Sequence, residues 1–301
     1  METGRKTINS DLIKKLSDLD CKIFKDEPLL RHTSFKIGGP ADYLIEIPSE
    51  KALLEFLQNI GKEKVFIIGK GTNILFSDEG FRGIIIKLCK DFENFSCLEN
   101  TLSCGAGANL ASVLRFSAEK SLSGLEHCAG IPGTVGGAVF GNAGNANNGI
   151  CERIKNIEVV NNGIKQIVDK SEINFIYRRS NINGIITAVN FLLTGSNENG
   201  ILKMISDNLS GRKKTQPLGK PNAGCVFKNP KGFSAGKLID EAGLKGLKIG
   251  GAQISEIHAN FIINSSGAKA SDVLELIRLI KNKIKEKFNI VLEEEIKIIN
   301  P

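Results

Sequence analysis

The chain carries a glycine-dense stretch, AGIPGTVGGAVFGNAGN, at residues 129–145. Glycine is useful where the backbone needs a positive φ or where no Cβ atom can be tolerated. The apolar residues Ile131, Val135, Val139 and Phe140 interrupt the glycines, whereas a flexible linker is polar and rich in glycine and serine. The stretch therefore predicts an ordered loop whose backbone approaches another group closely.

A second glycine loop follows a short apolar segment. Residues 65–68, VFII, indicate a buried strand that runs into Gly69-Lys70-Gly71-Thr72-Asn73, whose successive N–H groups are suited to form an anion-binding nest. The loop lacks the G-x-G-x-x-G fingerprint, the chain has no G-x-x-x-x-G-K-[ST] motif, and another apolar strand follows at residues 83–88. A Rossmann domain and a P-loop NTPase are not supported. A phosphate cradle and an ordinary glycine-bearing turn both remain open.

Composition limits the class of protein. At 301 residues, the chain is long enough for two or three domains. Its formal charge of +7 is spread without a polybasic tract, and it has two tyrosines and no tryptophan, which favours anionic small molecules over nucleic acid. Seven cysteines without a C-x-x-C pair predict a reducing compartment, and hence a cytoplasmic protein. We expect no metal site and no membrane insertion, because the three histidines are isolated and no long apolar run occurs.

Hydrophobic periodicity predicts alternating helices and strands. A polar break at residues 194–200 is interpreted as a domain junction. Ser49 and Ser271 are expected to cap the helices that follow them. In the last strand, alternation predicts that Glu293 and Glu295 share one face. The expected helices span 9–19, 49–57, 109–120, 201–209 and 271–288, and the expected strands 43–48, 65–68, 83–88, 102–108, 157–160, 165–168, 185–193 and 290–299.

Three places are candidates for chemistry. Cys225 lies in NAGCVFKNP at residues 222–230, where small residues precede a thiol and a Lys-Asn pair follows it. The second place is Tyr177-Arg178, and the third is the pair Glu293 and Glu295. Taken singly, each has a simpler interpretation: a buried structural cysteine, a surface turn and a solvated edge strand.

Taken together and in order, these segments resemble the UDP-N-acetylenolpyruvoylglucosamine reductase family, flavin enzymes of peptidoglycan synthesis. The resemblance runs from Leu30 almost to the end of the chain. The matching motifs are residues 31–41 (RHTSFKIGGPA), 69–73 (GKGTN), 130–138 (GIPGTVGGA), 177–180 (YRRS), 222–230 (NAGCVFKNP), 250–253 (GGAQ) and 292–296 (LEEEI).

The resemblance implies an α+β protein with an FAD-binding fold of the vanillyl-alcohol-oxidase (PCMH) type in two lobes and a C-terminal α+β substrate domain. The division expected on this basis is an N-terminal helix at 1–20, FAD-binding lobes at 21–90 and 91–196, and a substrate-binding domain at 197–301. It also implies that NADPH reduces FAD, which then reduces the enolpyruvyl group of a UDP-sugar. We expect a monomer.

Residue roles follow from the same resemblance. Arg178 and Glu295 match residues that polarise and stabilise the carboxylate side of the substrate, and Cys225 matches the proton donor. The residues matched to FAD binding are Gly69, Lys70, Gly71, Thr72, Asn73, Ile74, Pro132, Gly133, Thr134, Gly136 and Gly137. Those matched to substrate binding are Tyr177, Arg212, Lys214, Lys228 and Asn229.

The chain departs from the family pattern in three places. The proton donor is usually serine, and a thiol keeps that role because its reference pKa, about 8.5, lies nearer neutrality. No tyrosine follows Tyr177, so the chain resembles the subclass without a tyrosine lid. Phe140-Gly141-Asn142 and residues 145–148 replace what is expected after the glycine stretch.

Two alternatives belong to different classes. Another flavoenzyme of the same fold, oxidising an alcohol with oxygen, would typically tether its flavin covalently, with His32 and His127 as candidates. A non-catalytic nucleotide-binding module would leave Arg178, Cys225 and Glu295 without a purpose. A visible spectrum separates the module, which binds no flavin, from both flavoenzymes.

Overall fold

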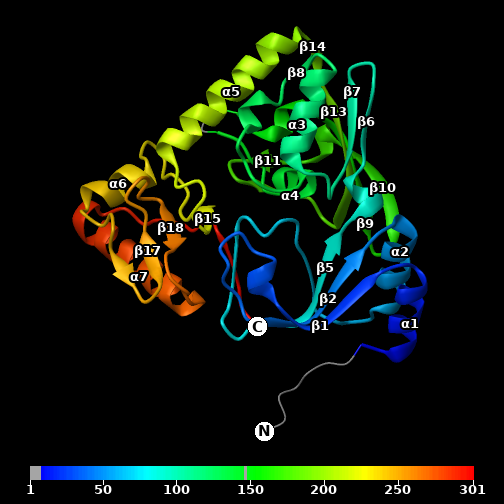
Figure 1. Cartoon of the computed structure of the whole chain (residues 1–301), viewed down its shortest axis with the longest axis horizontal. Helices are drawn as coiled ribbons and strands as arrows, with labels where there is room; N and C mark the ends of the chain where they lie inside the picture. Colours follow the sequence, from blue (N-terminus) through cyan, green and yellow to red (C-terminus); the bar gives the residue numbers. More distant parts are fainter. Residues whose placement is uncertain (1–7, 146–147) are drawn as a thin grey trace. The chain divides into compact units, whose positions relative to one another are not determined.

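The computed structural model describes residues 8–145 and 148–301, which divide into two compact units. Unit 1 comprises the chain up to Lys25 together with Tyr43–Gly69 and Gly83–Gly211, and unit 2 comprises Asp26–Asp42, Lys70–Arg82 and Arg212–Pro301. Figure 1 colours the chain along its sequence. Each unit is thus built from segments that are far apart in the sequence. Residues 146 and 147, part of the departure at 145–148, lie outside the described residues.

The first sheet, most of which belongs to unit 1, has the strand order β1-β2-β5-β3, with β3 parallel to β5. Its strands are β1 (Lys22–Pro28), β2 (Pro40–Ile47), β5 (Phe81–Leu88) and β3 (Val65–Ile67). Figure 1 shows β1, β2 and β5 side by side. Helices α1 (Ser10–Asp18) and α2 (Glu50–Asn59) contact each other and bury Leu16, Leu53 and Phe56 in the core of this unit. The expected cap of α2 is confirmed, because the Ser49 hydroxyl accepts a hydrogen bond from the N–H of Ala52 at 3.3 Å.

The second sheet of unit 1 is antiparallel, with the order β10-β9-β13-β7-β6. Its strands are β10 (Ile164–Asp169), β9 (Ile154–Asn161), β13 (Ile185–Leu192), β7 (Thr101–Gly105) and β6 (Phe95–Leu98). One face is apolar and buried, with Leu102, Val189 and Ile157 in the same core cluster as residues of α3 (Leu110–Glu119) and α4 (Val135–Phe140). The other face carries polar residues, since Asn190 lies opposite both Asn156 and Ser103.

Shorter elements complete unit 1. Two short antiparallel pairs accompany the second sheet, β8 (Leu122–Ser123) with β14 (Thr194–Gly195), and β11 (Phe175–Ile176) with β12 (Arg179–Ser180). Among the described residues, unit 1 also has the 3₁₀ helices η2 (Lys90–Glu93), η3 (Glu126–Cys128), η4 (Ile150–Arg153) and η5 (Lys170–Glu172), whereas η1 (Leu29–Arg31) lies in unit 2.

Unit 2 is built on the sheet β15-β18-β17-β16 and two helices. These elements are β15 (Asn222–Cys225), β18 (Phe261–Asn264), β17 (Ala252–Ile254), β16 (Lys248–Ile249), α6 (Ala235–Glu241) and α7 (Ala270–Phe288). A separate parallel pair joins β4 (Ile74–Phe76) to β19 (Lys297–Ile299). Phe35, Ile37 and Leu75 come from the early segments and lie in the same core cluster as residues of α6 and α7. This burial explains why residues 26–42 and 70–82 belong to unit 2.

Most expected elements are present, and three boundaries differ. The expected helix 201–209 is longer: α5 runs over Glu198–Thr215 and includes Gly200 and Gly211. The expected strand 290–299 is mostly wrong, because only Lys297–Ile299 is a strand. Residues 293–295 instead run beside residues 226–228, with an isolated antiparallel bridge between Phe227 and Glu294. Glu293 and Glu295 therefore cannot be placed on a face by strand alternation.

The third difference concerns the start of α7, where Ser271 is not the cap. The N-cap is Lys269, whose N–H donates to the Asp272 carboxylate at 3.0 Å. The carboxylate of Asp78, from an early segment of unit 2, accepts the N–H groups of Ala270 at 2.6 Å and Ser271 at 3.0 Å. A helix leaves its first N–H groups without intrahelical partners, and an anion near them is stabilising. Partial burial raises the pKa of Asp78, but these hydrogen bonds outweigh it and lower that pKa overall.

We predict that Asp78→Ala lowers the free energy of unfolding by about 1 kcal/mol, as loss of a helix cap does. Because the folded pKa of Asp78 is lowered, this contribution is present above the unfolded pKa of about 3.9 and is lost as pH falls through the folded pKa. Urea denaturation from about pH 7 down to about pH 3 measures the difference, with Glu79→Ala as the control. A difference between Asp78→Ala and the parent that stays constant with pH would contradict this capping role.

Candidate active site

The two glycine loops meet within unit 1. A Cβ atom on Gly69 would lie 2.4 Å from Oγ1 of Thr134, closer than real Cβ contacts allow, so the missing side chain lets the loops touch. Thr134 is the N-cap of α4, and its hydroxyl accepts a hydrogen bond from the N–H of Gly137 at 3.3 Å. Gly136 is also crowded, since its Cβ would lie 2.7 Å from that of Ala106. Pro132 and Gly133, which has a φ of +139°, precede Thr134 in the same loop.

Lys70 and Gly71 continue the first loop in unit 2. Gly71 has a φ of +60°, and its Cβ would lie 2.2 Å from the carbonyl oxygen of His32. The Gly71 carbonyl accepts the N–H of Ser34 at 3.1 Å. Within residues 8–145 and 148–301, the backbone N–H groups of Lys70 and Gly71 have no hydrogen-bond acceptor. Two successive N–H groups without an internal partner fit an anionic group such as the pyrophosphate of FAD.

The rest of this loop leads to Glu295. Thr72 is followed by Asn73, whose side-chain Nδ2 donates to the carbonyl of Glu295 at 3.2 Å. The Asn73 carbonyl accepts the N–H of Lys297 at 3.0 Å, and Ile74 opens β4 opposite Lys297. A loop matched to the cofactor and a residue matched to catalysis are therefore adjacent in unit 2.

Cys225 ends strand β15, opposite Phe261 of β18, and is partly exposed. Gly224 precedes it with a φ of +78°, and the N–H of Gly224 donates to Oδ1 of Asn222 at 2.8 Å. The next residue, Val226, accepts the N–H of Glu295 on its carbonyl at 2.8 Å. The segments of Cys225 and Glu295 are thus joined by a backbone hydrogen bond directly beside the thiol residue.

Lys228 and Asn229 extend the same segment. The N–H of Lys228 donates to the carbonyl of Glu293 at 2.8 Å, and their side chains form an ion pair. The Oδ1 of Asn229 accepts the N–H of Ala235 at 3.0 Å, at the first residue of α6. Segment 225–229 is consequently fixed along its length by hydrogen bonds within unit 2.

Tyr177 and Arg178 form the two-residue turn between β11 and β12 in unit 1. Arg178 has a φ of +57°, and its guanidinium carbon lies 5.3 Å from the centre of the Tyr177 ring. Hydrogen bonds fix this hairpin to the end of the glycine stretch: Asn142 Nδ2 donates to the carbonyl of Ile176 at 3.0 Å, and the Ser180 hydroxyl donates to that of Phe140 at 2.8 Å. The departure at residues 140–142 therefore has a structural role, since Asn142 helps to hold the turn of Arg178.

Arg212 and Lys214 lie in the last turn of α5. Basic side chains in a last turn interact favourably with the helix dipole, which is sufficient reason for their presence. Lys214 is exposed and Arg212 partly exposed.

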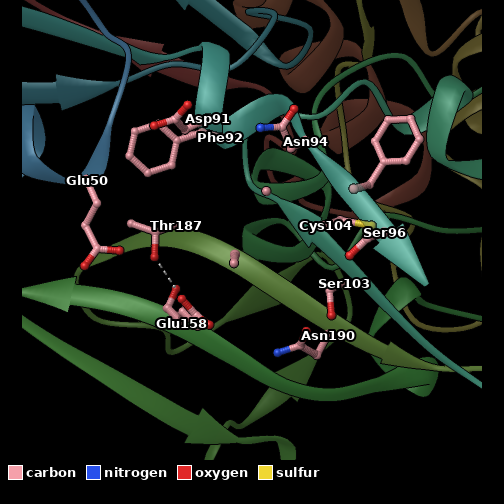
Figure 2. A pocket seen from close by; sticks show the side chains of 13 residues that line it. Glu50, Asp91, Phe92, Asn94, Ser96, Ser103, Cys104, Glu158, Thr187 and Asn190 are labelled. Atoms are coloured by element: carbon pink, nitrogen blue, oxygen red, sulfur yellow. Dashed lines mark hydrogen bonds between the residues drawn. The ribbon is translucent and has the colours of Figure 1, made fainter. Parts of the chain in front are cut away.

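A hollow of about 450 Å³ lies elsewhere in unit 1, over the polar face of the five-stranded sheet (Figure 2). Figure 2 shows Glu50 and Glu158 at one end and Ser96, Ser103 and Asn190 at the other. Lys165 bridges the two carboxylates, with Nζ 2.7 Å from Glu50 and 2.9 Å from Glu158. No residue matched to cofactor, substrate or catalysis lines this hollow.

The residues predicted from sequence fall into two groups in the structure. Unit 2 brings Asn73, Cys225, Lys228 and Glu295 together, whereas in unit 1 the hairpin of Arg178 is bonded to residues 140 and 142, at the end of the glycine stretch. Ser34 was not predicted from sequence, yet its hydroxyl donates to the carbonyl of Asn222 at 2.7 Å and so ties the opening motif to the segment of Cys225. Its place as a short polar residue within a matched motif was the available signal for it.

The chemistry of these groups suits binding of a polar, anionic group and transfer of a proton. They comprise a guanidinium, a thiol, a carboxylate and an ammonium group on loops fixed by hydrogen bonds. Among the described residues, no group of three or more histidine, cysteine, aspartate or glutamate side chains is arranged to hold a metal ion. In the same part of the chain, every helix is too short or too polar to cross a membrane.

Comparisons with known proteins show which family the chain is similar to. A family model described as the C-terminal domain of UDP-N-acetylenolpyruvoylglucosamine reductase matches residues 216–299, and an FAD-binding domain matches residues 41–164. The reductase 2 of Symbiobacterium thermophilum is 39% identical over 92% of both chains. The reductase of Caldanaerobacter subterraneus subsp. tengcongensis is 40% identical over 96% of this chain and 98% of its own.

A solved structure gives the same result for the fold. The UDP-N-acetylenolpyruvylglucosamine reductase (MurB) from Thermus caldophilus is 35% identical, with a TM-score of 0.82 over 92% of this chain and 98% of that chain. The expected α+β fold with an FAD-binding domain is confirmed. With relatives this similar along nearly its whole length, and with the matched motifs assembled as described, the chain belongs to the UDP-N-acetylenolpyruvoylglucosamine reductase family.

Proposed function

We propose that this chain reduces UDP-N-acetylglucosamine enolpyruvate to UDP-N-acetylmuramate, with FAD as its cofactor and NADPH as the reductant, in peptidoglycan precursor synthesis. The observation that carries the proposal is the backbone hydrogen bond of 2.8 Å that joins the segments of Cys225 and Glu295 beside Asn73. Family membership supports the same reaction, because the relatives are named as reductases of this substrate class.

Each region of the chain has a task in this proposal. Loops 69–74 and 132–137 hold FAD, and the two N–H groups of Lys70 and Gly71 are suited to its pyrophosphate. The lobes at 21–90 and 91–196 bind the cofactor, and residues 197–301 bind the UDP-sugar. The FAD-binding match at 41–164 and the C-terminal match at 216–299 support this division.

The residues proposed to surround the substrate stabilise negative charge and deliver a proton. Bound FAD, once reduced by NADPH, supplies the hydride for the enolpyruvyl double bond. The accompanying negative charge on the carboxylate side needs electrostatic stabilisation, which Arg178 provides through two N–H groups that match a carboxylate. Cys225 delivers the proton that completes the product. Glu295 acts together with Arg178 on the carboxylate side of the substrate.

The remaining polar residues bind the substrate. Lys228 and Asn229 follow Cys225 and are placed to contact the sugar, while Tyr177 lies beside Arg178. Arg212 and Lys214 are the proposed cations for the UDP pyrophosphate. The proposal includes a monomer in the cytoplasm, and the seven free cysteines support a reducing compartment. Light scattering of the purified enzyme tests the oligomeric state.

We predict that the protein binds FAD and that NADPH bleaches its absorbance under anaerobic conditions. Addition of UDP-N-acetylglucosamine enolpyruvate should then restore the oxidised spectrum, because that substrate accepts the hydride. Stopped-flow absorbance follows both steps. If the reduced flavin persists with this substrate but is reoxidised by oxygen, the assigned reaction is wrong.

A second prediction tests the thiol. Cys225→Ala should leave reduction by NADPH intact and slow reoxidation by the enolpyruvyl substrate about 10²- to 10⁴-fold, the contribution typical of a general acid. Cys225→Ser should recover much of the rate. The matched control is Cys97→Ala, another partly exposed cysteine, which lies on β6 outside the proposed site. An alanine variant at position 225 with an unchanged second step would exclude Cys225 as the donor.

A further inference from the structure

Asn260 precedes β18 and is buried, with 3% of its surface exposed. Its side-chain Oδ1 accepts the N–H of Phe227 at 2.9 Å, and its Nδ2 donates to the carbonyl of Phe227 at 2.8 Å. Its backbone carbonyl accepts the N–H of Val226 at 2.8 Å. One residue therefore binds three backbone polar groups of the two residues that directly follow Cys225.

The opposite side of the same segment is bound by the residues around Glu295. The Val226 carbonyl accepts the N–H of Glu295 at 2.8 Å, and the N–H of Lys228 donates to Glu293 at 2.8 Å. The side chains of Val226 and Phe227 are 2% and 1% exposed, so packing also prevents this segment from turning. Residues 226–228 thus lie between Asn260 and the segment that carries Glu295.

A carboxamide matches both polar groups of Phe227, because it offers a donor and an acceptor at any pH, whereas a carboxylate offers acceptors alone. Asn260 is itself held by His258, whose Nδ1 accepts the N–H of Asn260 at 3.2 Å. Burial, and to a lesser extent Lys245, lowers the pKa of His258, which favours the neutral ring with a free lone pair. A Cβ atom on Gly236 would lie 2.9 Å from Cε1 of His258, so glycine in α6 leaves space for this ring.

We propose that Asn260 is a positioning residue for proton transfer: by binding Val226 and Phe227, it sets where the Cys225 thiol lies relative to Glu295. This inference rests on the proposed function. Asn260 does not itself react, because it is buried and its carboxamide is occupied by Phe227. A displacement of about 1 Å is enough to reduce a rate by up to about 10²-fold, so the backbone clamp has a large effect on the second step.

The test uses Asn260→Asp in the FAD-loaded full chain. At about pH 8 the carboxylate still accepts the N–H of Phe227 but repels its carbonyl, so reoxidation by the enolpyruvyl substrate should slow about 10- to 100-fold. Reduction by NADPH should stay within about twofold of the parent. A defect confined to one of the two steps distinguishes a positioning role from general damage to the protein. At about pH 5.5 a buried carboxyl is largely protonated and donates again, so the second step should recover.

The matched control is Asn264→Asp, on the strand that Asn260 precedes. Asn264 also binds backbone with its carboxamide, at Phe35, Lys36 and Ala268, and these bonds do not involve residues 225–229. It should lose thermal stability like Asn260→Asp, yet show no step-specific defect and no recovery at low pH. Alkylation of Cys225 by iodoacetamide, followed by peptide mass spectrometry, gives a readout that does not depend on turnover. It should be several-fold faster in Asn260→Asp alone, because loss of the clamp lets the segment of the thiol move.

Three results would overturn the proposal: equal slowing of both steps, no recovery at low pH, or an alkylation rate the same as in Asn264→Asp. Asn260→Ser, which is uncharged and too short to bind both groups of Phe227, replaces the aspartate variant if that variant does not fold. It should show the same defect in the second step without recovery at low pH. Failure of the parent enzyme to be reoxidised by the substrate would refute the proposed function instead, because that result does not involve Asn260.

Discussion

The backbone pairing of residues 226–228 with 293–295 is the constraint on which the arrangement of unit 2 depends. It is short, with hydrogen bonds of 2.8 Å at Val226 and Lys228 and a bridge at Phe227. Yet it joins the end of β15 to the approach to β19, and Asn73 connects the same place to the first glycine loop. Net contributions of about 1 kcal/mol per hydrogen bond would not hold so short a pairing alone. The burial of Val226 and Phe227 supplies the remaining stability.

The glycines of the two loops are required by contacts within the protein itself. Gly69 meets Thr134, Gly71 meets the backbone of His32, and Gly136 meets Ala106. A side chain at any of these positions would displace backbone or a capping residue before it reached a ligand. The loops are therefore shaped by their own packing, which leaves the N–H groups of Lys70 and Gly71 without acceptors among the described residues.

Much of the secondary structure could be predicted from the local sequence. The Ser49 cap, the strand at Val65 and the apolar face of the last helix follow from periodicity and short-range hydrogen bonding, and the structure has all three. The order of the matched motifs was sufficient to predict the family, which the comparisons confirm. Long-range partners were not accessible in this way. Asp78 binds the start of α7 from a distant segment, so Ser271 was wrongly preferred as the cap, and the acidic run at 293–295 pairs with a loop instead of forming a strand.

In the candidate site too, local motifs could be predicted from the sequence and distant partners could not. Matched motifs predict which residues carry the chemistry, and Cys225 and Glu295 do lie on hydrogen-bonded segments. Ser34 lies in a matched motif, but nothing in the sequence around Ser34 or Asn260 names the backbone near the thiol as their partner, because that partner lies in another segment. Such roles depend on tertiary packing and become visible only when the chain is folded.

The interleaving of the two units bears on how the chain is made. Phe35, Ile37 and Leu75 emerge early from the ribosome, but they pack in a core whose other members belong to the last third of the sequence. Those apolar side chains must wait for most of the chain before they are covered, and contacts so distant in sequence form slowly. The same dependence applies to excised fragments. A piece covering only residues 216–299, the extent of the C-terminal family match, lacks Phe35, Ile37, Leu75 and the carboxylate that caps α7, and so exposes the apolar surface that those residues cover.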